Sequence, residues 1–378
     1  MKSLIVDQIL SVNYKYTVNL INNLYKYDVN IQLVSDEKKD FKEVNCGVEM
    51  KFNTTDKSLS KIKKAINYIK TWRYIVKKCE KEDIDLIHVQ WFILSPIDWL
   101  YLKKLNSKGV KIVVTVHDIL PFNQKFYDYK YHKKIYELAN KIIVQAQINK
   151  EKIIKLFDGL DNKVVYIPHG NFVNYAKQIN KKEARDYLNL PQDKKIILFF
   201  GQIKKVKGLD YLLNAMVKIN KIRDDIILVI AGKVWEDKFD KYRKIIDDNK
   251  LTNVVRCDIK YIPDNDISYY YSACDLNALP YLNVYQSGVI QLAYAHRKPV
   301  VASDIPSFRE VVLDNISGKL FETKNSEELS SSILELFNGQ YDLSEMGQKG
   351  YDYIEDKFSW DKIAKSVAAI YEEVGGKI

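Results

Sequence analysis

The sequence has no long uncharged hydrophobic run and few cysteines. No stretch of the 378 residues approaches the ~18 consecutive apolar residues that cross a membrane. The apolar run near the start is short and is interrupted by Asp7, so it predicts no secretory signal. The four cysteines, at positions 46, 79, 257 and 274, lie far apart and show neither a CxxC pair nor metal-ligand spacing. We therefore expect a protein of the reducing cytosol, without disulfides or a bound metal.

Several catalytic and architectural patterns are also missing. No Ser-His-Asp arrangement, metal-ligand cluster or pair of carboxylates stands out. No short-period repeat is present, which argues against a solenoid. Because 47% of the residues are hydrophobic and 12% aromatic, the chain is expected to be globular. Its length exceeds what one hydrophobic core usually serves, so two domains are predicted.

The net charge of +10 is distributed unevenly. Residues 1–200 hold 35 Lys and Arg against 22 Asp and Glu, a balance of +13. Residues 201–378 hold 24 against 27, a balance of −3. The excess positive charge therefore belongs to the first half and indicates an anionic partner there, such as a membrane surface or a nucleic acid. A nucleic acid is the less favoured partner, because no recognised binding motif accompanies the basic residues.

Strand-like and helix-like segments alternate along the whole chain. The strand candidates of the first half are residues 4–9, 30–34, 85–90, 111–116, 141–144 and 163–167. Those of the second half are residues 196–200, 226–231, 254–257, 276–279 and 299–302. Alternating βα units predict an α/β protein in which each half has a parallel sheet covered by helices on both faces.

The boundary between the halves is expected in the polar stretch 170–195, and we place it at 180/181. An N-terminal domain then spans residues 1–180, and a C-terminal domain spans residues 181–357. The last helix, residues 358–376, follows an irregular stretch. Two alternatives stay open for it: it packs back on the first domain, or it is a terminal core helix.

Residues 58–79 are the most basic amphipathic segment of the chain. Their apolar stripe is formed by Leu59, Ile62, Ile66, Ile69 and Val76, with lysines around it and Trp72 and Tyr74 near its end. A helix of this composition can lie on anionic lipid. The alternative is a helix that faces the core and leaves its lysines solvated. The charge asymmetry of the chain favours membrane contact.

The segment KIILFFGQIKKVKG, residues 195–208, combines a strand, a glycine turn and a helix start. A short apolar run ends at Gly201, and a cationic loop with Lys204 and Lys207 then leads to Gly208 and an amphipathic helix. Backbone N–H groups beside lysines can hold a phosphate or a diphosphate. The alternative is an ordinary βα connection with solvated lysines.

This segment and several others resemble, in order, those of a known family. They are TVHDILPF at 115–122, IPHGN at 167–171, FFGQIKKVKG at 199–208, IAG at 230–232, YIPD at 261–264 and the long stretch from YSACDLNALPY to SFREVV at 271–312. Nearly the whole chain is thus similar to family 4 glycosyltransferases. The resemblance implies a GT-B fold, in which two Rossmann-like domains face a cleft. It also implies that a sugar moves from a nucleotide-sugar donor to an acceptor with retention at the anomeric carbon and without a metal.

The resemblance assigns donor-binding roles in the second half. Lys207 matches the family's diphosphate lysine, and the charge of the leaving diphosphate gives it a catalytic role. Gln202 stands where the family often has an arginine, a charge that Lys204 can supply. Gly201 belongs to the same loop.

A second anion site is implied at Gln286, Ser287 and Gly288, where a helix begins. For Ser287, a plain N-cap is the alternative. Tyr261 and Ile262 match the segment that faces the nucleobase, although a buried structural aromatic is an equally good interpretation.

One departure from the family concerns two glutamates, eight positions apart, that many relatives carry. The corresponding positions here are Val284 and Leu292, neither of them acidic. The sequence of this stretch resembles that of a branch of the family that also lacks the pair. Recognition of the ribose and of the donor sugar is therefore left unassigned.

In the first half, His117 follows the strand candidate at 112–116, where the ligand-facing residues of an open parallel sheet are expected. The family places a histidine here, near the reacting sugar. Asp118 is expected to orient His117 or to contact the acceptor. Structural roles are favoured for His88 and His169, and helix-surface positions for His132 and His296.

The sequence thus predicts a hexosyltransferase at the inner face of the membrane that extends a lipid-linked or polysaccharide precursor. Its donor would be a UDP- or GDP-sugar, with no further cofactor. The N-terminal domain would bind the acceptor, and the leaving diphosphate would help to remove the acceptor proton. A GT-B epimerase and a non-catalytic scaffold that binds nucleotide sugars are the alternatives.

Overall fold

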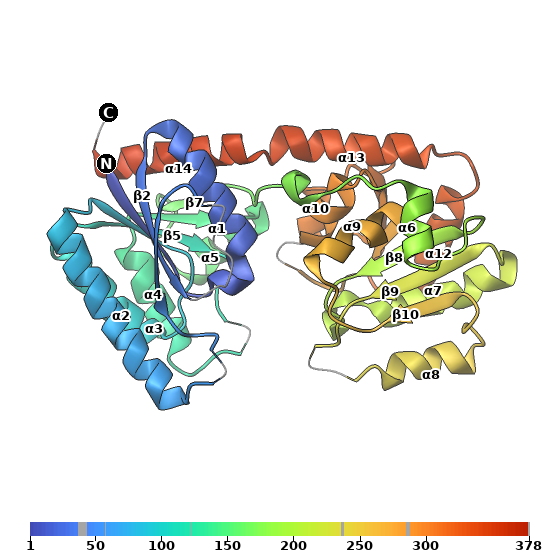
Figure 1. The fold of residues 1–378 in the computed structure, drawn as a ribbon, viewed down its shortest axis with the longest axis horizontal. Helices are drawn as coiled ribbons and strands as arrows, with labels where there is room; N and C mark the ends of the chain where they lie inside the picture. The colour runs from blue at the N-terminus through green and yellow to red at the C-terminus, as the bar shows by residue number, and fades with distance from the viewer. Residues whose placement is uncertain (37–43, 57, 122, 236–237, 285–287, 377–378) are drawn as a thin grey trace. The chain divides into compact units, whose positions relative to one another are not determined.

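The computed structural model describes residues 1–36, 44–56, 58–121, 123–235, 238–284 and 288–376 (Figure 1). The chain divides into two compact units. The first comprises Met1–Gly170 and Phe358–Ile378, and the second is Asn171–Lys357. Each is built on one parallel sheet, so the predicted α/β class with two parallel-sheet domains is confirmed.

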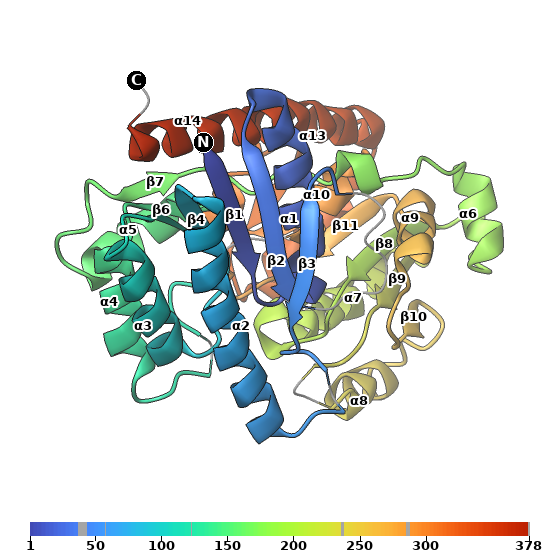
Figure 2. The same cartoon turned by 60° about the vertical axis from the view of Figure 1, so that its left-hand side comes forward.

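The sheet of the first unit has seven strands in the order β3-β2-β1-β4-β5-β6-β7. Figure 2 shows β1, β2 and β3 side by side. The bounds are β1 Lys2–Asp7, β2 Asn30–Asp36, β3 Gly47–Phe52, β4 Leu86–Val89, β5 Lys111–Val116, β6 Lys141–Val144 and β7 Val164–Tyr166. On the inner strand β1, Ser3 lies opposite Ile31 of β2 and Leu86 of β4. The inner strands are buried on both faces, which explains their continuous apolar sequences.

Two sets of helices cover this sheet. The bounds are α1 Leu10–Leu24, α2 Lys61–Glu82, α3 Ser95–Asn106, α4 Asp128–Leu138, α5 Gln147–Leu156 and α14 Trp360–Gly375, with a 3₁₀ turn, η1, at Tyr25–Tyr27. Along β1, Leu4 and Val6 belong to the core beneath α2, α3, α4 and α5. Ile5, one residue between them, belongs to the core beneath α1 and α14. This alternation is the period of a strand whose successive side chains enter opposite layers.

The second unit has a six-stranded parallel sheet in the order β10-β9-β8-β11-β12-β13. Its strands are β8 Lys195–Phe200, β9 Ile226–Ala231, β10 Val255–Asp258, β11 Leu276–Leu279, β12 Val300–Ser303 and β13 Gly318–Phe321. Its helices are η2 Val173–Tyr175, α6 Lys181–Tyr187, η3 Lys205–Lys207, α7 Leu209–Ile222, α8 Asp240–Asp248, α9 Asp264–Ala273, α10 Gly288–Ala295, α11 Pro306–Arg309, α12 Ser326–Leu336 and α13 Leu343–Lys357. The buried face of α7 carries Leu209, Leu212 and Met216, at the spacing of an amphipathic helix.

The division between the units falls at 170/171, ten residues before the predicted 180/181. The segment that follows Gly170 is held by hydrogen bonds inside the second unit. Asn171 Nδ2 donates to the carbonyl of Ile354 at 3.1 Å, and Lys177 N donates to Ser268 Oγ at 3.1 Å. The polar composition of this segment gave no sign of these long-range partners. Helix α14 belongs to the first unit, where it packs against α1.

Two strands of the structure, β3 and β13, are missing from the sequence-based assignment. Both lie at an edge of their sheet. The strand β3 reads GVEMKF and buries only Phe52 fully, and β13 has four residues and begins with Gly318. Edge strands of this kind lack the continuous apolar run that identifies an inner strand.

The predicted apolar stripe of residues 58–79 is wrong in part. Helix α2 begins at Lys61, after Ser60, whose side chain accepts a hydrogen bond from Lys63 N. Its buried residues are Tyr68, Thr71, Trp72, Ile75, Val76, Lys78 and Cys79. Ile62 and Ile66 are instead 74% and 49% exposed. In the described part of the chain, no helix is both long and apolar enough to cross a membrane.

Candidate functional site

The loop after β8 in the second unit brings a lysine against a glycine. Gly201 follows Phe200 with φ +99°, a conformation that L side chains rarely adopt. A Cβ atom added to Gly201 would lie 3.1 Å from Lys207 Nζ and 3.5 Å from Val289 Cγ2. The ammonium group of Lys207 thus lies beside the backbone at the carboxyl end of β8, and the first turn of α10 lies next to both.

Gly208 fixes the other end of this loop. It adopts φ +62° between η3 and α7, and a Cβ atom there would lie 1.9 Å from the carbonyl oxygen of Pro280. Only glycine therefore allows this approach. Because Pro280 directly follows β11, the contact holds the loop against the end of a second strand of the sheet.

Two lysines of the loop rest on aromatic rings. Lys207 Nζ lies 5.0 Å from the ring centroid of Tyr281, and Lys204 Nζ lies 5.4 Å from that of Trp235. Among the residues that the structure describes, neither has a carboxylate oxygen within 4.0 Å. Their charges are therefore available to an anion, while the rings restrict where the ammonium groups lie.

Trp235 is absent from the sequence-based set of site residues. It is exposed, and its backbone N–H donates to Ile203 O at 3.0 Å, which joins it to the lysine loop. The signal that could have found it is its place a few residues after β9, because the carboxyl ends of parallel strands form the ligand edge of such a sheet.

Of the predicted second anion segment, the structure describes only one residue. Gln286 and Ser287 lie outside the described residues. Gly288 is the exposed first residue of α10. The side chain of Val289, next to it, lies 3.5 Å from where a Cβ atom of Gly201 would be. The described parts of the two predicted donor segments therefore lie together.

The remaining donor candidates differ in exposure. Gln202 is exposed in the loop itself. Tyr261 is 69% exposed, so its interpretation as a buried structural aromatic is wrong. Ile262 is buried in the core, which leaves only its backbone for a ligand contact. No hydrogen bond or ring contact joins Tyr261 to the lysine loop in the described part of the chain.

In the first unit, His117 lies at the centre of a polar cluster formed by three neighbouring strand ends. It follows β5, Gln90 follows β4 and Gln145 follows β6. Its Nε2 lies 3.1 Å from Gln90 Oε1 and 3.0 Å from Asn13 Nδ2, and its Nδ1 lies 3.1 Å from Gln145 Oε1. Both ring nitrogens therefore have neutral amide partners.

Aromatic rings enclose the same imidazole. The Trp91 ring stacks on His117 with centroids 4.8 Å apart and planes at 15°, and Tyr16 meets it edge-on at 5.1 Å. His117 is 7% exposed, and this burial lowers its pKa to about 3, with a smaller contribution from His169. The imidazole is therefore uncharged at neutral pH. Its amide contacts make it a fixed hydrogen-bonding group rather than a mobile base.

A pocket of about 310 Å³ opens beside His117, within the first unit. Its polar wall includes Asp118, Asn123, Lys125 and Asp128, and its aromatic wall includes Trp91, Phe92, His132 and Tyr136. The indole Nε1 of Trp91 is buried and has no hydrogen-bond partner among the described residues. The volume is at the lower end of the ~300–1,000 Å³ typical of small-molecule sites, so the pocket fits a single ring better than a long ligand.

The other histidines have structural contacts. His88 hydrogen-bonds to Tyr371 OH at 2.6 Å and to Thr115 Oγ1 at 2.7 Å. His169 packs between Tyr16 and Trp360, with ring centroids 5.2 and 6.0 Å away. Structural roles were expected for both.

The expectation that His132 and His296 lie on helix surfaces is wrong, because both are buried. His132 hydrogen-bonds to Asp128 O at 2.8 Å and contributes to the pocket beside His117. His296 hydrogen-bonds to Ser268 Oγ at 3.0 Å and stacks on Tyr271. Both rings are also covered from other segments: Phe92 meets His132 edge-on with ring centroids 5.9 Å apart, and Ser268 and Tyr271 belong to α9.

No group of three or more His, Cys, Asp or Glu that could hold a metal ion occurs among the described residues. The polar groups of the lysine loop include two cations, whereas the groups that hydrogen-bond to His117 are neutral amides. The arrangement as a whole suits an anion in the second unit and a neutral hydroxylated ring in the first.

Comparisons with known proteins agree with this architecture. The family description "Glycosyl transferases group 1" matches residues 180–353, and "Glycosyltransferase Family 4" matches residues 15–171. An uncharacterised glycosyltransferase of Methanocaldococcus jannaschii is 27% identical over 311 residues, which cover 82% of this chain and 80% of that protein.

Solved structures show the same fold. A glycosyltransferase of Rickettsia africae aligns over the full length of both chains with a TM-score of 0.80 and 19% identity. HepE of Anabaena, solved in complex with UDP, aligns over 99% of this chain and 100% of that one with a TM-score of 0.78 and 17% identity. The two family matches lie in the two units, and the chain belongs to the glycosyltransferases of the GT-B fold.

Proposed function

We propose that this glycosyltransferase moves a hexose from a nucleotide-diphosphate sugar to a hydroxyl of a lipid-linked or polysaccharide precursor. The observation that carries the proposal is the loop after β8. It holds Lys207 Nζ beside Gly201 and the start of α10, with no carboxylate near it among the described residues. A diphosphate needs both positive charge and close access to backbone N–H groups, and a glycine supplies that access.

The donor half of the reaction depends on charge. As the bond between the anomeric carbon and the diphosphate breaks, negative charge accumulates on the leaving diphosphate. Lys207 stabilises that charge, and Lys204 supplies the charge that an arginine at position 202 gives many relatives. The nucleotide-sugar donor is supported by HepE, which has also been solved in complex with UDP-glucose.

The acceptor half depends mainly on an uncharged histidine and on aromatic side chains. The pocket beside His117 is lined by the aromatic side chains of Trp91 and Phe92, which suit a sugar ring. His117 holds the reacting hydroxyl in place, and Asp118 at the pocket wall contacts the acceptor.

We further propose retention at the anomeric carbon without a metal. In the transfer, the bond from the anomeric carbon to the diphosphate oxygen breaks and a bond to the acceptor oxygen forms on the same face of the sugar. The acceptor proton passes to an oxygen of the leaving diphosphate. His117, with a pKa of about 3, is a poor base, which favours the diphosphate for this role.

Helix α2 suits a peripheral contact with an anionic membrane, at the inner face of the cell membrane. Its first turns expose Ile62 and Ile66 among the exposed lysines 61, 63 and 70. Apolar side chains within a basic helix face bind anionic lipid by burial and by charge. Lys78, near the other end, is engaged instead with Glu49 at 2.8 Å and Glu82 at 2.7 Å.

Vesicle sedimentation tests the membrane contact. Replacement of Ile62 and Ile66 by Ser should weaken binding to anionic vesicles several-fold, and neutral vesicles should bind the wild-type chain poorly. The matched control is Leu100→Ser. It removes an exposed aliphatic side chain of similar size from another helix of the first unit. Equal binding of the double variant and the control would overturn the contact without affecting the transferase proposal.

The transferase proposal itself is tested by a product assay with UDP- and GDP-sugars. Melting temperatures measured with each nucleotide choose the donor, because a ligand that binds only the folded chain raises its melting temperature. Formation of a glycosylated product supports an enzyme. Nucleotide binding with neither transfer nor donor hydrolysis would support a non-catalytic binding protein and contradict the proposal.

A further inference from the structure

A cavity of about 420 Å³ lies in the second unit, at the edge of the sheet opposite to the lysine loop. Lys195 begins β8, Asp275 precedes β11 and Pro299 precedes β12, and all three line the cavity at the amino ends of these strands. A six-residue strand is about 20 Å long, so the cavity is separate from the site at Gly201.

The cationic side chains of this cavity outnumber its carboxylates. The charged residues that line it are Lys181, Lys195, Arg297, Lys298, Asp275 and Asp342. Lysines that line a cavity can bind an anion only if nearby carboxylates do not already neutralise them. The partners of each carboxylate therefore decide what the cavity can bind.

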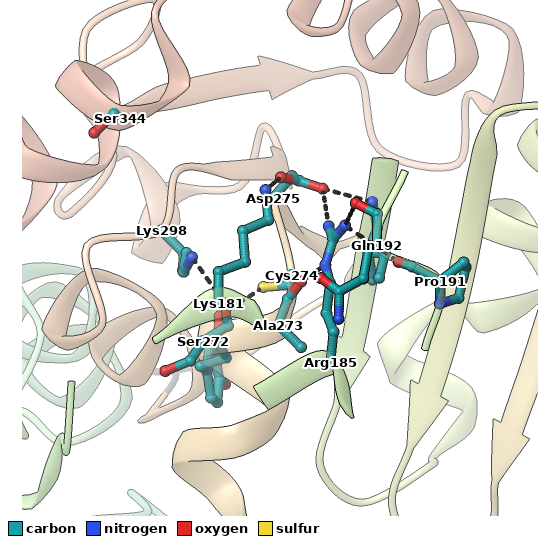
Figure 3. Close-up of polar contacts among 12 residues, drawn as sticks. Lys181, Arg185, Pro191, Gln192, Ser272, Ala273, Cys274, Asp275, Lys298 and Ser344 are labelled. Carbon is teal, nitrogen blue, oxygen red and sulfur yellow. Dashed lines mark hydrogen bonds and ion pairs between the residues drawn. The ribbon is translucent and has the colours of Figure 1, made fainter. Parts of the chain in front are cut away.

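Asp275 is saturated by its own neighbours, as Figure 3 shows. Its Oδ2 accepts from Arg185 Nη2 at 2.9 Å and from Ile196 N at 2.7 Å, and its Oδ1 forms an ion pair with Lys181. Arg185 is buried and also donates to the carbonyl oxygen of Gln192 at 2.7 Å. The negative charge of Asp275 is thus neutralised by Arg185 and Lys181, and it does not neutralise the other cations of the cavity.

Asp342 is engaged at the start of α13. Its Oδ1 accepts from the backbone N–H of Ser344 at 2.8 Å and from that of Glu345 at 3.2 Å. This is the geometry of a helix cap, and it directs the carboxylate to the backbone rather than to a lysine.

Three cations of the cavity are left without a carboxylate partner among the described residues. Lys298 is half-buried, and its Nζ donates to the carbonyl oxygen of Ser272 at 3.3 Å. Burial lowers the pKa of Lys298, because the charged form loses solvation. Arg297 lies over the ring of Tyr351 at 4.3 Å, and Lys195 is exposed.

The equivalent cavity of the first unit has the opposite balance. It has about 480 Å³ and lies at the amino ends of β4 and β5. Glu80, Asp83 and Asp85 line it against Lys108 and Lys111, and Lys108 pairs with Glu80 at 2.7 Å. An excess of cations over carboxylates is therefore a property of the second cavity and not of this position in the fold.

We propose that the cavity at the amino ends of β8, β11 and β12 binds a phosphoryl group through Lys195, Arg297 and Lys298. A phosphoryl group carries close to two negative charges at neutral pH and three strong acceptor oxygens. The hydroxyl of Ser344, at the rim of the cavity, is a further donor. The volume exceeds that of one phosphate ion, so a phosphomonoester such as a sugar phosphate fits it.

The test is calorimetric titration of the full chain with inorganic phosphate and with a hexose phosphate, against chloride at equal ionic strength. Lys298→Met should weaken binding at least tenfold, and Lys195→Met several-fold. The control is Lys221→Met, which removes an exposed lysine of α7 in the same unit and should change affinity less than twofold. Tighter binding of the hexose phosphate assigns the site to a phosphomonoester, and equal binding assigns it to free phosphate.

Three results would overturn the site. Phosphate and hexose phosphate could bind no better than chloride, Lys298→Met could match Lys221→Met, or binding could vanish in Lys207→Met alone, which would place it in the lysine loop. Because Lys298 lacks a carboxylate partner and loses only one hydrogen bond of 3.3 Å, its replacement by methionine should change the melting temperature little. If that variant fails to fold, the exposed Lys195→Met still decides the question.

Discussion

The carboxyl ends of the two sheets carry opposite kinds of polar group. After β8 in the second unit, lysines rest on aromatic rings with their charge unneutralised by any described carboxylate. After β4, β5 and β6 in the first unit, a buried histidine is fixed by uncharged amides and a tryptophan ring. Both edges come from the same parallel architecture. The side chains at the strand ends, and not the fold, therefore determine what each unit can bind.

This contrast assigns the charged substrate to the second unit and the neutral one to the first. A cation placed beside a glycine suits a diphosphate, and an uncharged histidine beside a pocket with an aromatic wall suits a sugar ring. Each assignment can be broken by a substitution that leaves the other unit intact.

The largest effect is expected from Lys207→Ala. Loss of a cation that stabilises the leaving diphosphate should lower kcat by about 10²–10³-fold, the size found for the loss of one group that stabilises transition-state charge. The melting temperature should stay close to that of the wild type, because Lys207 forms no ion pair with a described residue. Steady-state transfer kinetics provide the measurement.

The control for that variant is Lys205→Ala, an exposed lysine of the same 3₁₀ turn. It should change kcat less than threefold. Similar losses in the two variants would mean that only the general charge of the loop matters, and the specific role of Lys207 would be refuted.

A smaller effect is expected from Trp91→Phe. The substitution keeps an aromatic face against His117 but reduces the aromatic surface that lines the acceptor pocket. Loss of part of this aromatic surface should raise KM for the acceptor by about threefold to tenfold and leave KM for the donor unchanged. Trp99→Phe, outside the pocket in the same unit, is the control. A change in the donor KM would contradict the separation of the two sites.

The smallest effect concerns pH and stability. The pKa of His117 is about 3 in the folded chain and near 6.5 when unfolded, so between these values only the unfolded chain takes up this proton. The contribution of the uncharged His117 to the free energy of unfolding is fully present above pH 6.5. It is lost as the pH falls below 6.5, by at most about 1.4 kcal/mol per pH unit. The free energy of unfolding of His117→Gln should therefore fall less steeply between pH 6 and 4 than that of the wild type.

Denaturant titration at several pH values measures this difference. Parallel pH profiles for the two proteins would show that His117 takes up its proton over the same pH range in the folded and the unfolded chain. The neutral character of the first unit's site would then be wrong. His88, which has a similarly low pKa of about 3, is present in both proteins and cancels from the comparison.

The inner strands and the position of His117 follow from the sequence, because apolar runs buried on both faces are a local signal. The residues that hold His117 do not. Gln90, Gln145 and Asn13 come from three other segments, and only the strand order of the sheet brings them together. The same holds for Trp235, whose contact with Lys204 depends on the neighbouring strands β8 and β9.

The errors in α2 have a different origin. The sequence shows an apolar stripe but not where the partner surface ends. Trp72 packs on Tyr101 and the core, whereas Ile62 and Ile66 lie beyond the surface that the sheet and its helices cover. Burial along a helix is set by the extent of its partners, which periodicity does not contain.

The most direct test of the account is calorimetric titration of the wild type and of Lys207→Ala with UDP and with GDP. The account predicts that the wild type binds one of these nucleotides and that the variant binds it at least tenfold more weakly. Equal affinities in the two proteins would show that the lysine beside Gly201 does not hold a diphosphate, and they would contradict the assignment of the charged substrate to the second unit.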